Sequence, residues 1–210
     1  MHDDEGAAKI AAAFGAILVT TDLKPVGAKR TLGFRHSKGD LLLVGDDDDL
    51  QSPVYLAATI AAHEAGHPIT CTREFRYVDQ PTGRCARWSG YHRYAPETGY
   101  HRAYDRAVLE SVGGWAEAPR GVDTLTHRKI VATAKWPKEH DIANVTLDGT
   151  RIADTMINLQ HGANIWRREF PPEGKKAMWG HWLIEGESHI SDAVPPPADS
   201  QRALLARLLS

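Results

Sequence analysis

Residues 54–67 read Val-Tyr-Leu-Ala-Ala-Thr-Ile-Ala-Ala-His-Glu-Ala-Gly-His, a run dominated by strong helix formers. Ser52 and Pro53 precede this run, and these residue types are favoured at the N-cap and at the first position of a helix. Pro68 follows the run and prevents the helix from continuing. The pattern therefore predicts a central, largely buried helix over 54–67.

The end of this helix carries the motif His-Glu-x-x-His, formed by His63, Glu64 and His67. Residues four apart lie on one helix face, so both imidazoles could reach one metal ion. Zinc is the expected ion, because imidazole and carboxylate ligands with one open position are its catalytic arrangement. Glu64 would then accept a proton from the metal-bound water. The motif predicts a zinc-dependent metallopeptidase.

A catalytic zinc ion needs a third protein ligand, which this helix does not supply. The extension that would place a third histidine six residues after His67 is absent, because Thr70 and Arg73 occupy its positions. Spacing alone leaves several downstream candidates open. They are His92, Glu97, His101, Asp105, Glu110, Asp123 and His127.

The segment Ala61–His67 resembles the start of the protease domain of FtsH-type AAA proteases, the peptidase M41 family. The stretches 109–117, with its Gly-Gly pair, and 121–125 resemble later signatures of that domain, in the same order. The resemblance covers about residues 54–136. It implies a zincin-like fold in which His63 and His67 bind zinc, Glu64 is the base and Asp123 is the third ligand. No Walker A pattern occurs, so an ATP-powered protease is not expected from this chain alone.

A second resemblance is to the ImmA/IrrE-type peptidases, which also place a short helix and small strands before a His-Glu-x-x-His helix. The acidic helix of that family has only a poor match in residues 102–107. Two other function classes stay open. One is a zincin-fold regulatory or nucleic-acid-associated binding protein, and the other is a metal-dependent hydrolase that acts on a non-peptide substrate.

The composition of the chain limits the classes of partner that it is expected to bind. The 210 residues carry a net charge of −2, so a grossly basic surface for nucleic acid is not expected, despite many arginines within 72–106. No stretch is long and apolar enough to span a membrane, and two cysteines are too few for a disulfide framework. We expect a cytoplasmic protein whose partner is a protein or peptide substrate.

The fold class expected is α+β, zincin-like and mainly helical, with a small N-terminal β-sheet. Residues 1–140 would form the peptidase domain, and residues 141–210 a helical C-terminal portion that packs on it or mediates association. The expected strands are 17–20, 31–36 and 41–44, and the expected helices, besides 54–67, are 7–14, 102–115, 125–136, 151–168, 175–184 and 200–209. Residues 70–100 are expected to form an irregular loop region that could include short strands.

Several other residues allow two interpretations. Residues 41–44 could be an edge strand that receives a peptide or an interior strand. His127 could support a metal ligand or be an ordinary, partly exposed histidine. The run 46–49 of four aspartates is expected to be a solvated turn. A donor for the oxyanion could come from Tyr91, His92, Tyr94, Tyr100 or His101.

Overall fold

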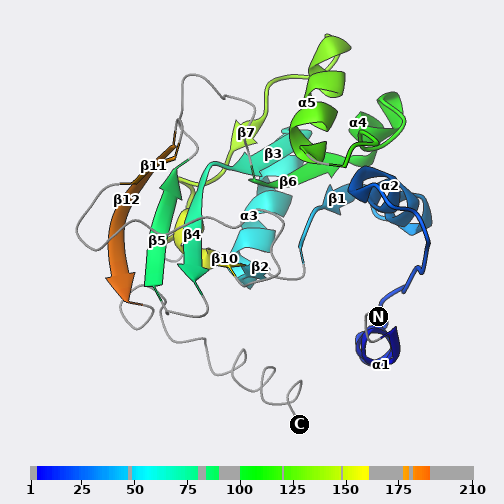
Figure 1. Cartoon of the computed structure of the whole chain (residues 1–210). Coiled ribbons are helices and arrows are strands. Elements are labelled where there is room, and N and C mark those ends of the chain that lie inside the picture. Colours follow the sequence, from blue (N-terminus) through cyan, green and yellow to red (C-terminus); the bar gives the residue numbers. More distant parts are fainter. Residues whose placement is uncertain are drawn as a thin grey trace. The chain divides into compact units, whose positions relative to one another are not determined.

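The computed structural model describes residues 4–46, 49–79, 84–89, 100–119, 121–147, 149–160, 177–179 and 182–189. Within them the chain mixes helices and strands, which confirms the α+β class (Figure 1). The elements are α1 (Asp4–Ala13), α2 (Val26–His36), β1 (Leu41–Leu43), β2 (Asp49–Gln51), α3 (Pro53–Glu64), β3 (Ile69–Thr72), β4 (Glu74–Asp79), β5 (Arg84–Ser89), β6 (Tyr100–Asp105), α4 (Arg106–Ser111), α5 (Val122–Ala132), β7 (His140–Asp141), β8 (Thr146–Leu147), β9 (Thr150–Arg151), the 3-10 helix η1 (Ile152–Thr155), β10 (Met156–Gln160), β11 (Ala177–Trp179) and β12 (Trp182–His189).

The chain forms two compact units, each made of two chain segments. Unit 1 comprises Met1–Leu42 and Tyr104–Lys138, and unit 2 comprises Leu43–Ala103 and Glu139–Ser210. The chain passes from one unit to the other within β1, within β6 and after Lys138. This division differs from the single boundary after residue 140 that the sequence suggested.

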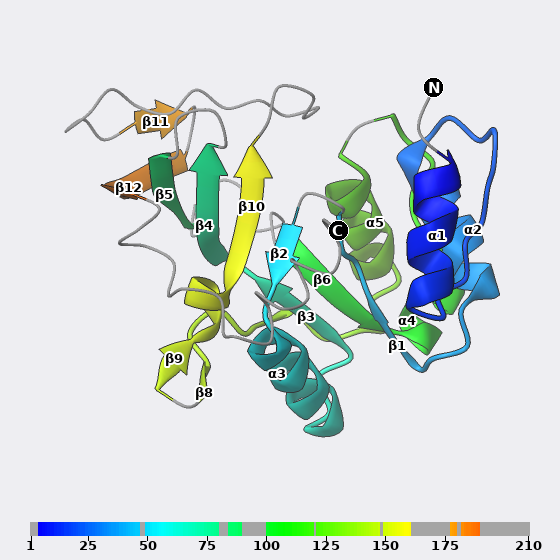
Figure 2. The same ribbon diagram turned by 90° about the horizontal axis from the view of Figure 1, so that it is seen from below.

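The core of unit 2 forms where α3 meets segments that follow it by many residues. Tyr55 and Ala58 of α3 are buried with Phe75, Ile142, Ile152 and Met156. Leu56 and Ile60, on another face of α3, are 46% and 41% exposed. The helix is therefore buried on one face, not largely buried as its composition suggested. It lies beside β3, the strand that follows it in the chain (Figure 2).

Two sheets organise the strands. A six-stranded sheet has the order β11-β12-β5-β4-β10-β2, in which β10 runs parallel to β4 and antiparallel to β2. A four-stranded sheet has the order β1-β6-β3-β7, with β7 parallel to β3. Strand β1 therefore stands at a sheet edge, the first of the two interpretations of residues 41–44. Residues 70–100 were expected to form an irregular region that could include short strands, and their described part contributes to β3, β4 and β5.

The core of unit 1 gathers around Trp115. Its indole ring makes edge-on contacts with Phe34 and Tyr104, with ring centroids 6.2 and 6.1 Å away. The Trp115 backbone N–H donates to Thr31 Oγ1 at 3.0 Å. Gly114 has φ +94°, and a Cβ at that position would lie 2.7 Å from the Thr31 side chain. Glycine at position 114 therefore allows the close approach of the Thr31 side chain.

The expected helices at 151–168 and 175–184 are wrong in the residues that the structure describes. Residues 152–155 form only a 3-10 turn, and strands β10, β11 and β12 follow. Strand β12 pairs with β5 and with β11, so hydrogen bonds to distant segments override the local helix preference. The expected helix at 200–209 lies outside the described residues.

Three further expectations in the first half of the chain need correction. Residues 31–36 belong to helix α2, not to a strand. Residues 17–20 form no strand. The expected helix at 102–115 is divided, because residues 100–105 pair as strand β6 before α4 begins. The expected helices near 7–14 and 125–136 are confirmed as α1 and α5.

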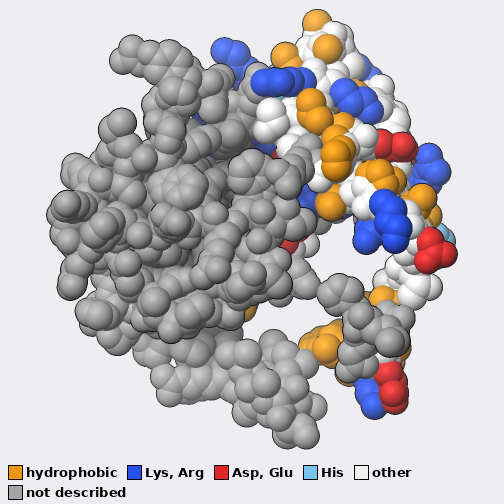
Figure 3. Space-filling view, in the orientation of Figure 1, with side chains coloured by type: hydrophobic (Ala, Val, Ile, Leu, Met, Phe, Trp, Pro, Cys, Tyr) orange, Lys and Arg blue, Asp and Glu red, His pale blue; other side chains and the backbone are white. Residues whose placement is uncertain are grey.

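No helix among the described residues is long and apolar enough to cross a membrane. Leu125 and Val131 of α5 are exposed. On the described part of the face in Figure 3, apolar side chains lie among Lys and Arg side chains. That part of the surface is therefore not uniformly basic.

Candidate metal centre at the end of helix α3

Helix α3 ends at Glu64, earlier than predicted. Gly66 adopts φ +90°, its N–H donates to the His63 carbonyl at 2.9 Å, and the N–H of His67 donates to the Ala62 carbonyl at 3.0 Å. These two bonds define a Schellman motif, with Gly66 as the left-handed residue after the cap. His67 therefore lies outside the helix, and the shared helix face predicted for His63 and His67 does not form.

The proline after His67 explains this ending. A proline disfavours the helical conformation of the residue before it, and its ring clashes with the carbonyl four residues earlier. For Pro68 the residue before is His67, and the carbonyl is that of Glu64. The same five residues that match a zinc motif are thus also a helix stop signal: histidine in the last turn, then glycine, then proline.

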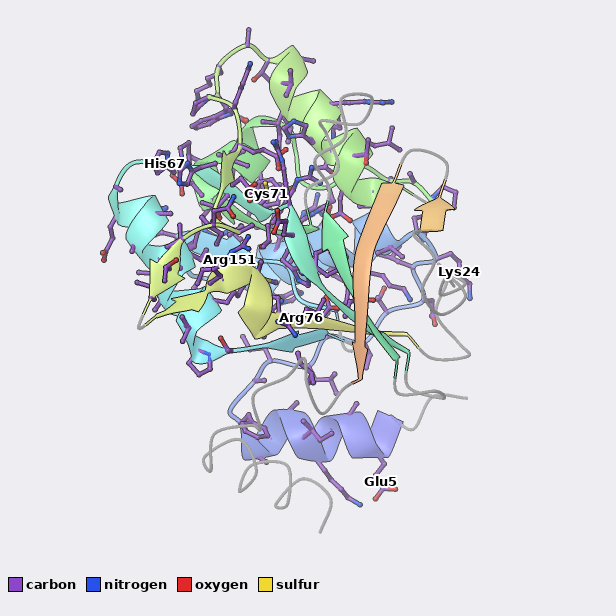
Figure 4. The ribbon with its side chains drawn as sticks, turned by 90° about the vertical axis from the view of Figure 1, so that its left-hand side faces the viewer. Glu5, Lys24, His67, Cys71, Arg76 and Arg151 are labelled. Atoms are coloured by element: carbon purple, nitrogen blue, oxygen red, sulfur yellow. The ribbon has the colours of Figure 1, made fainter. Side chains whose placement is uncertain are left out.

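The imidazole of His67 is half-buried and stacks on that of His140, the first residue of β7. The ring centroids are 3.9 Å apart and the rings are inclined by 6°. Burial lowers the pKa of His140, the nearby His67 lowers it further, and Asp141 opposes both effects. His140 is therefore neutral at pH 7 and keeps a nitrogen lone pair available. Figure 4 shows His67 where the chain leaves α3, above Cys71 of β3.

Glu64, the predicted base, is the last residue of α3 and is exposed to solvent. His63, one residue earlier, is half-buried. Both belong to unit 2, as do His67 and His140. The Glu64 carboxylate, next to the turn that carries His67, is accessible to solvent.

Asp123, the predicted third ligand, lies in unit 1 in the first turn of α5. It accepts a hydrogen bond from Arg30 Nη1 at 2.6 Å, and its side chain is 45% exposed. A carboxylate in the first turn of a helix is also stabilised by the helix dipole. The structure gives Asp123 an ion-pair role, while its role as a zinc ligand stays a prediction.

No group of three or more His, Cys, Asp or Glu side chains placed to hold a metal ion occurs among the described residues. The three predicted ligands His63, His67 and Asp123 are therefore not assembled as a zincin site in the described part of the chain. Of the other candidates, His92 and Glu97 lie outside the described residues. His127 is buried on α5 in unit 1 rather than exposed.

A buried polar cluster in unit 2 was not expected as a unit. His101 Nδ1 lies 3.2 Å from Gln51 Nε2 and 3.4 Å from Asp49 Oδ2. Both side chains are almost completely buried: that of Asp49 is 5% exposed and that of His101 is 4% exposed. Asp49 also accepts a hydrogen bond from Asn158 Nδ2 at 2.6 Å. The expected solvated turn is therefore wrong for Asp49.

His101 is held in an unusual state. Its φ is +49°, a conformation that non-glycine residues rarely adopt. Burial lowers its pKa to about 4 although Asp46 acts in the opposite direction, so the ring is neutral at pH 7. The Tyr55 hydroxyl donates to the His101 carbonyl at 2.7 Å, and Phe75 packs edge-on against the ring. No local pattern in the sequence indicates this cluster, since its members are separated by up to 109 residues.

A second buried polar contact lies beside this cluster in the sequence. Arg102 donates from Nε and Nη2 to the two carboxylate oxygens of Glu139, at 2.6 and 3.2 Å. Both side chains are 1% exposed.

Cys71 is a buried free thiol, and burial raises its pKa, so it stays protonated. A protonated, inaccessible thiol is a core residue rather than a nucleophile.

No protein-family model matches this chain, and none of the curated proteins matches it. The resemblance to FtsH-type peptidases is therefore carried by the quoted residues of the sequence.

Proposed function

We propose that this protein is a zinc-dependent peptidase whose metal site lies at the C-terminal end of α3. The observation that carries the proposal is the placing of His67, from the His-Glu-x-x-His segment, against a second imidazole in the same unit. Neutral imidazole nitrogens are preferred zinc ligands, so the donor chemistry at this point suits the ion. The zincin-like arrangement and the role of Asp123 belong to this proposal.

The C-terminal end of α3 adds electrostatic support. The last carbonyls of a helix carry a partial negative charge, which favours a cation nearby. Glu64 adds a full negative charge in the last helical residue. Together they make this end of α3 a favourable location for a divalent ion.

In the proposed reaction, zinc and Glu64 have separate roles. Bound zinc would lower the pKa of its water toward neutrality and polarise a carbonyl oxygen. Glu64 accepts the proton from the attacking water and passes it to the leaving amine. Strand β1 stands at the edge of its sheet in the part of the chain that the structure describes, and an extended peptide can pair with an edge strand.

The test combines metal content with peptide hydrolysis. Zinc is measured by mass spectrometry, and cleavage is followed on a fluorogenic peptide mixture with and without 1,10-phenanthroline. Glu64→Gln should keep its zinc and lose activity by about 100-fold or more, because general-base catalysis is removed. Glu5→Gln, a change to an exposed glutamate of α1, should keep full activity.

Other outcomes are equally informative. Full activity in Glu64→Gln contradicts the proposed role of the base. Zinc bound as tightly by Asp123→Ala as by the wild type removes Asp123 from the ligand set. Zinc binding together with cleavage of esters but not of peptides would indicate a non-peptide substrate. A protein that binds no zinc but shows salt-dependent binding to DNA or RNA would be the binding module instead.

A further inference from the structure

Helix α3 exposes an apolar face to solvent, opposite the side that is buried in the core of unit 2. Leu56 and Ile60 are 46% and 41% exposed, and Ala57 and Ala61 are exposed beside them. These four residues lie on one helix face, because residues three or four positions apart are neighbours on a helix. We call them the α3 apolar face. A contiguous apolar surface of this kind is typical of a contact site.

A later segment of the same chain has an apolar stripe of the same kind. In residues 200–209, which lie outside the described residues, the sequence predicts an amphipathic helix. Its stripe consists of Leu204, Leu205, Leu208 and Leu209. A helix of this length is only marginally stable by itself in water. The segment should therefore be helical only when its leucines pack against another apolar surface.

The chain between β12 and this segment is long enough to reach α3. Strand β12 ends at His189, and the ten residues 190–199 follow, with prolines at 195–197. A proline-rich chain extends by about 3.1 Å per residue, so this linker spans about 31 Å. Helix α3 begins two residues after β2, and β2 lies four strand positions from β12 in the same sheet. At a strand spacing of about 4.8 Å this separation is about 19 Å, which the linker covers.

The two surfaces carry opposite charges. Residues 200–209 contain Arg202 and Arg207 and no acidic residue. Helix α3 contains no Lys or Arg, and Glu64 is exposed at its last position, where the helix carbonyls also carry a partial negative charge. The small alanines of the α3 apolar face let a second helix approach closely. Charge and shape thus both favour residues 200–209 as the occupant of this face.

We propose that residues 200–209 dock as a helix on the α3 apolar face of the same chain, with the leucine stripe against Leu56 and Ile60. Two roles were expected for the C-terminal portion, packing on the rest of the chain and association between chains, and this contact is the first of them. It requires neither metal binding nor hydrolysis, so it is independent of the proposed function.

Hydrogen–deuterium exchange of the full-length protein, read by mass spectrometry, tests the docking. In the wild type the backbone amides of 204–208 should exchange about 10-fold or more slowly than in an unstructured chain, because an undocked helix of this length gives little protection. Ile60→Lys places a charge in the α3 apolar face and should remove this protection. Leu125→Lys changes a leucine of α5 that is 37% exposed, so it is the matched control and should leave the protection unchanged.

A second measurement detects the contact from the side of α3. The thiol of Ala57→Cys should react with a maleimide about 10-fold or more slowly than in the same variant with Leu204→Glu and Leu208→Glu, because docking shields position 57 from solvent. Mass spectrometry locates the label, so Cys71 and Cys85 do not interfere. Loss of protection in Ile60→Lys together with this faster labelling would support the proposal.

Three outcomes would overturn it. If the amides of 204–208 exchange at the unstructured rate in the wild type, the segment does not dock. If their protection survives Ile60→Lys, the segment packs on another surface. If the protection falls on dilution while light scattering shows dimers separating into monomers, the segment docks on a second copy of the chain and not on its own α3.

Discussion

His101 combines a left-handed backbone with a buried ring, and both features cost free energy. A non-glycine residue with positive φ costs about 1–2 kcal/mol. On folding, the His101 ring loses its contacts with water and gains contacts with Asp49, Gln51 and Phe75. Such a residue persists only where its surroundings determine its conformation, which here are strand β2, helix α3 and strand β4.

His101 should make the stability of the protein depend on pH. Its pKa is about 4 in the folded state, below the ordinary value of 6.5. The unfolded chain therefore binds more protons between these values, so stability falls as the pH drops from 6.5 toward 4, by about 3 kcal/mol at most. Urea unfolding of the wild type and of His101→Asn, a residue that tolerates positive φ, measures this. An equal pH slope in both proteins would contradict the assignment.

Two glycines of α2 provide a matched pair in unit 1. A Cβ at Gly27 would lie 1.8 Å from the carbonyl oxygen of Ala116, whereas one at Gly33 meets nothing within 4 Å. Gly27→Ala should therefore lower the free energy of unfolding by about 2 kcal/mol or more. Gly33→Ala should raise it by up to about 1 kcal/mol, because alanine favours the helix. Chemical denaturation compares them, and equal effects would contradict the close approach of α2 to Ala116.

Three helices end in the same way, through a glycine with positive φ. After α1, α3 and α4 the glycines are Gly15, Gly66 and Gly113, with φ values of 62°, 90° and 74°. In each case the N–H of the next residue bonds to a carbonyl five residues earlier, at 2.8, 3.0 and 2.8 Å. The two sequence signatures that suggested a peptidase, His-Glu-Ala-Gly-His and Gly-Gly, thus coincide with helix caps.

The cap after α3 predicts the sign of one substitution. Gly66→Ala should lower the free energy of unfolding by about 1 kcal/mol, because alanine disfavours positive φ. Steric contact contributes nothing, since a Cβ there meets no atom within 4 Å. Gly66→Asn should lose less, because asparagine tolerates this conformation. If the helix continued through His67, Gly66→Ala would instead stabilise the protein by about 1 kcal/mol.

At the scale of the whole molecule, unit 2 must join two chain segments that 35 intervening residues of unit 1 separate in the sequence. Arg102 lies one residue before its first segment ends, and Glu139 begins its second segment. Their two hydrogen bonds therefore connect the two segments of unit 2, next to the positions where the chain leaves this unit and returns to it. A buried ion pair of this geometry is costly to break, because the remaining buried charge would lose its ion-pair partner.

Breaking this ion pair should destabilise the whole of unit 2. Arg102→Met leaves the Glu139 carboxylate buried without its guanidinium and should lower the free energy of unfolding by about 3–5 kcal/mol. The double variant Arg102→Met/Glu139→Leu should recover part of this loss, since no charge remains buried. Urea unfolding followed by circular dichroism measures both. A loss below 1 kcal/mol in the single variant would show that the pair contributes little.

Local residue preferences determined several features of this protein before any folding partner was known. Ser52-Pro53 marks the start of α3, whereas the end predicted from Pro68, at His67, lies three residues beyond the observed end at Glu64. The beginning of α5 near Asp123 could also be predicted. These features depend on the φ preferences and hydrogen-bonding groups of neighbouring residues, which the sequence displays directly.

Only the tertiary structure decided the strands β10 to β12, the Asp49–His101 contact and the stacking of His67 on His140. A strand is stabilised by hydrogen bonds to another segment, so its partner must be known before its own residues favour the extended form. The same holds for His140, whose lack of motif spacing hid it until the pairing of β3 with β7 placed its ring against His67. Contacts between distant segments determine which residues lie together at the candidate site, and no local sequence pattern indicates these contacts.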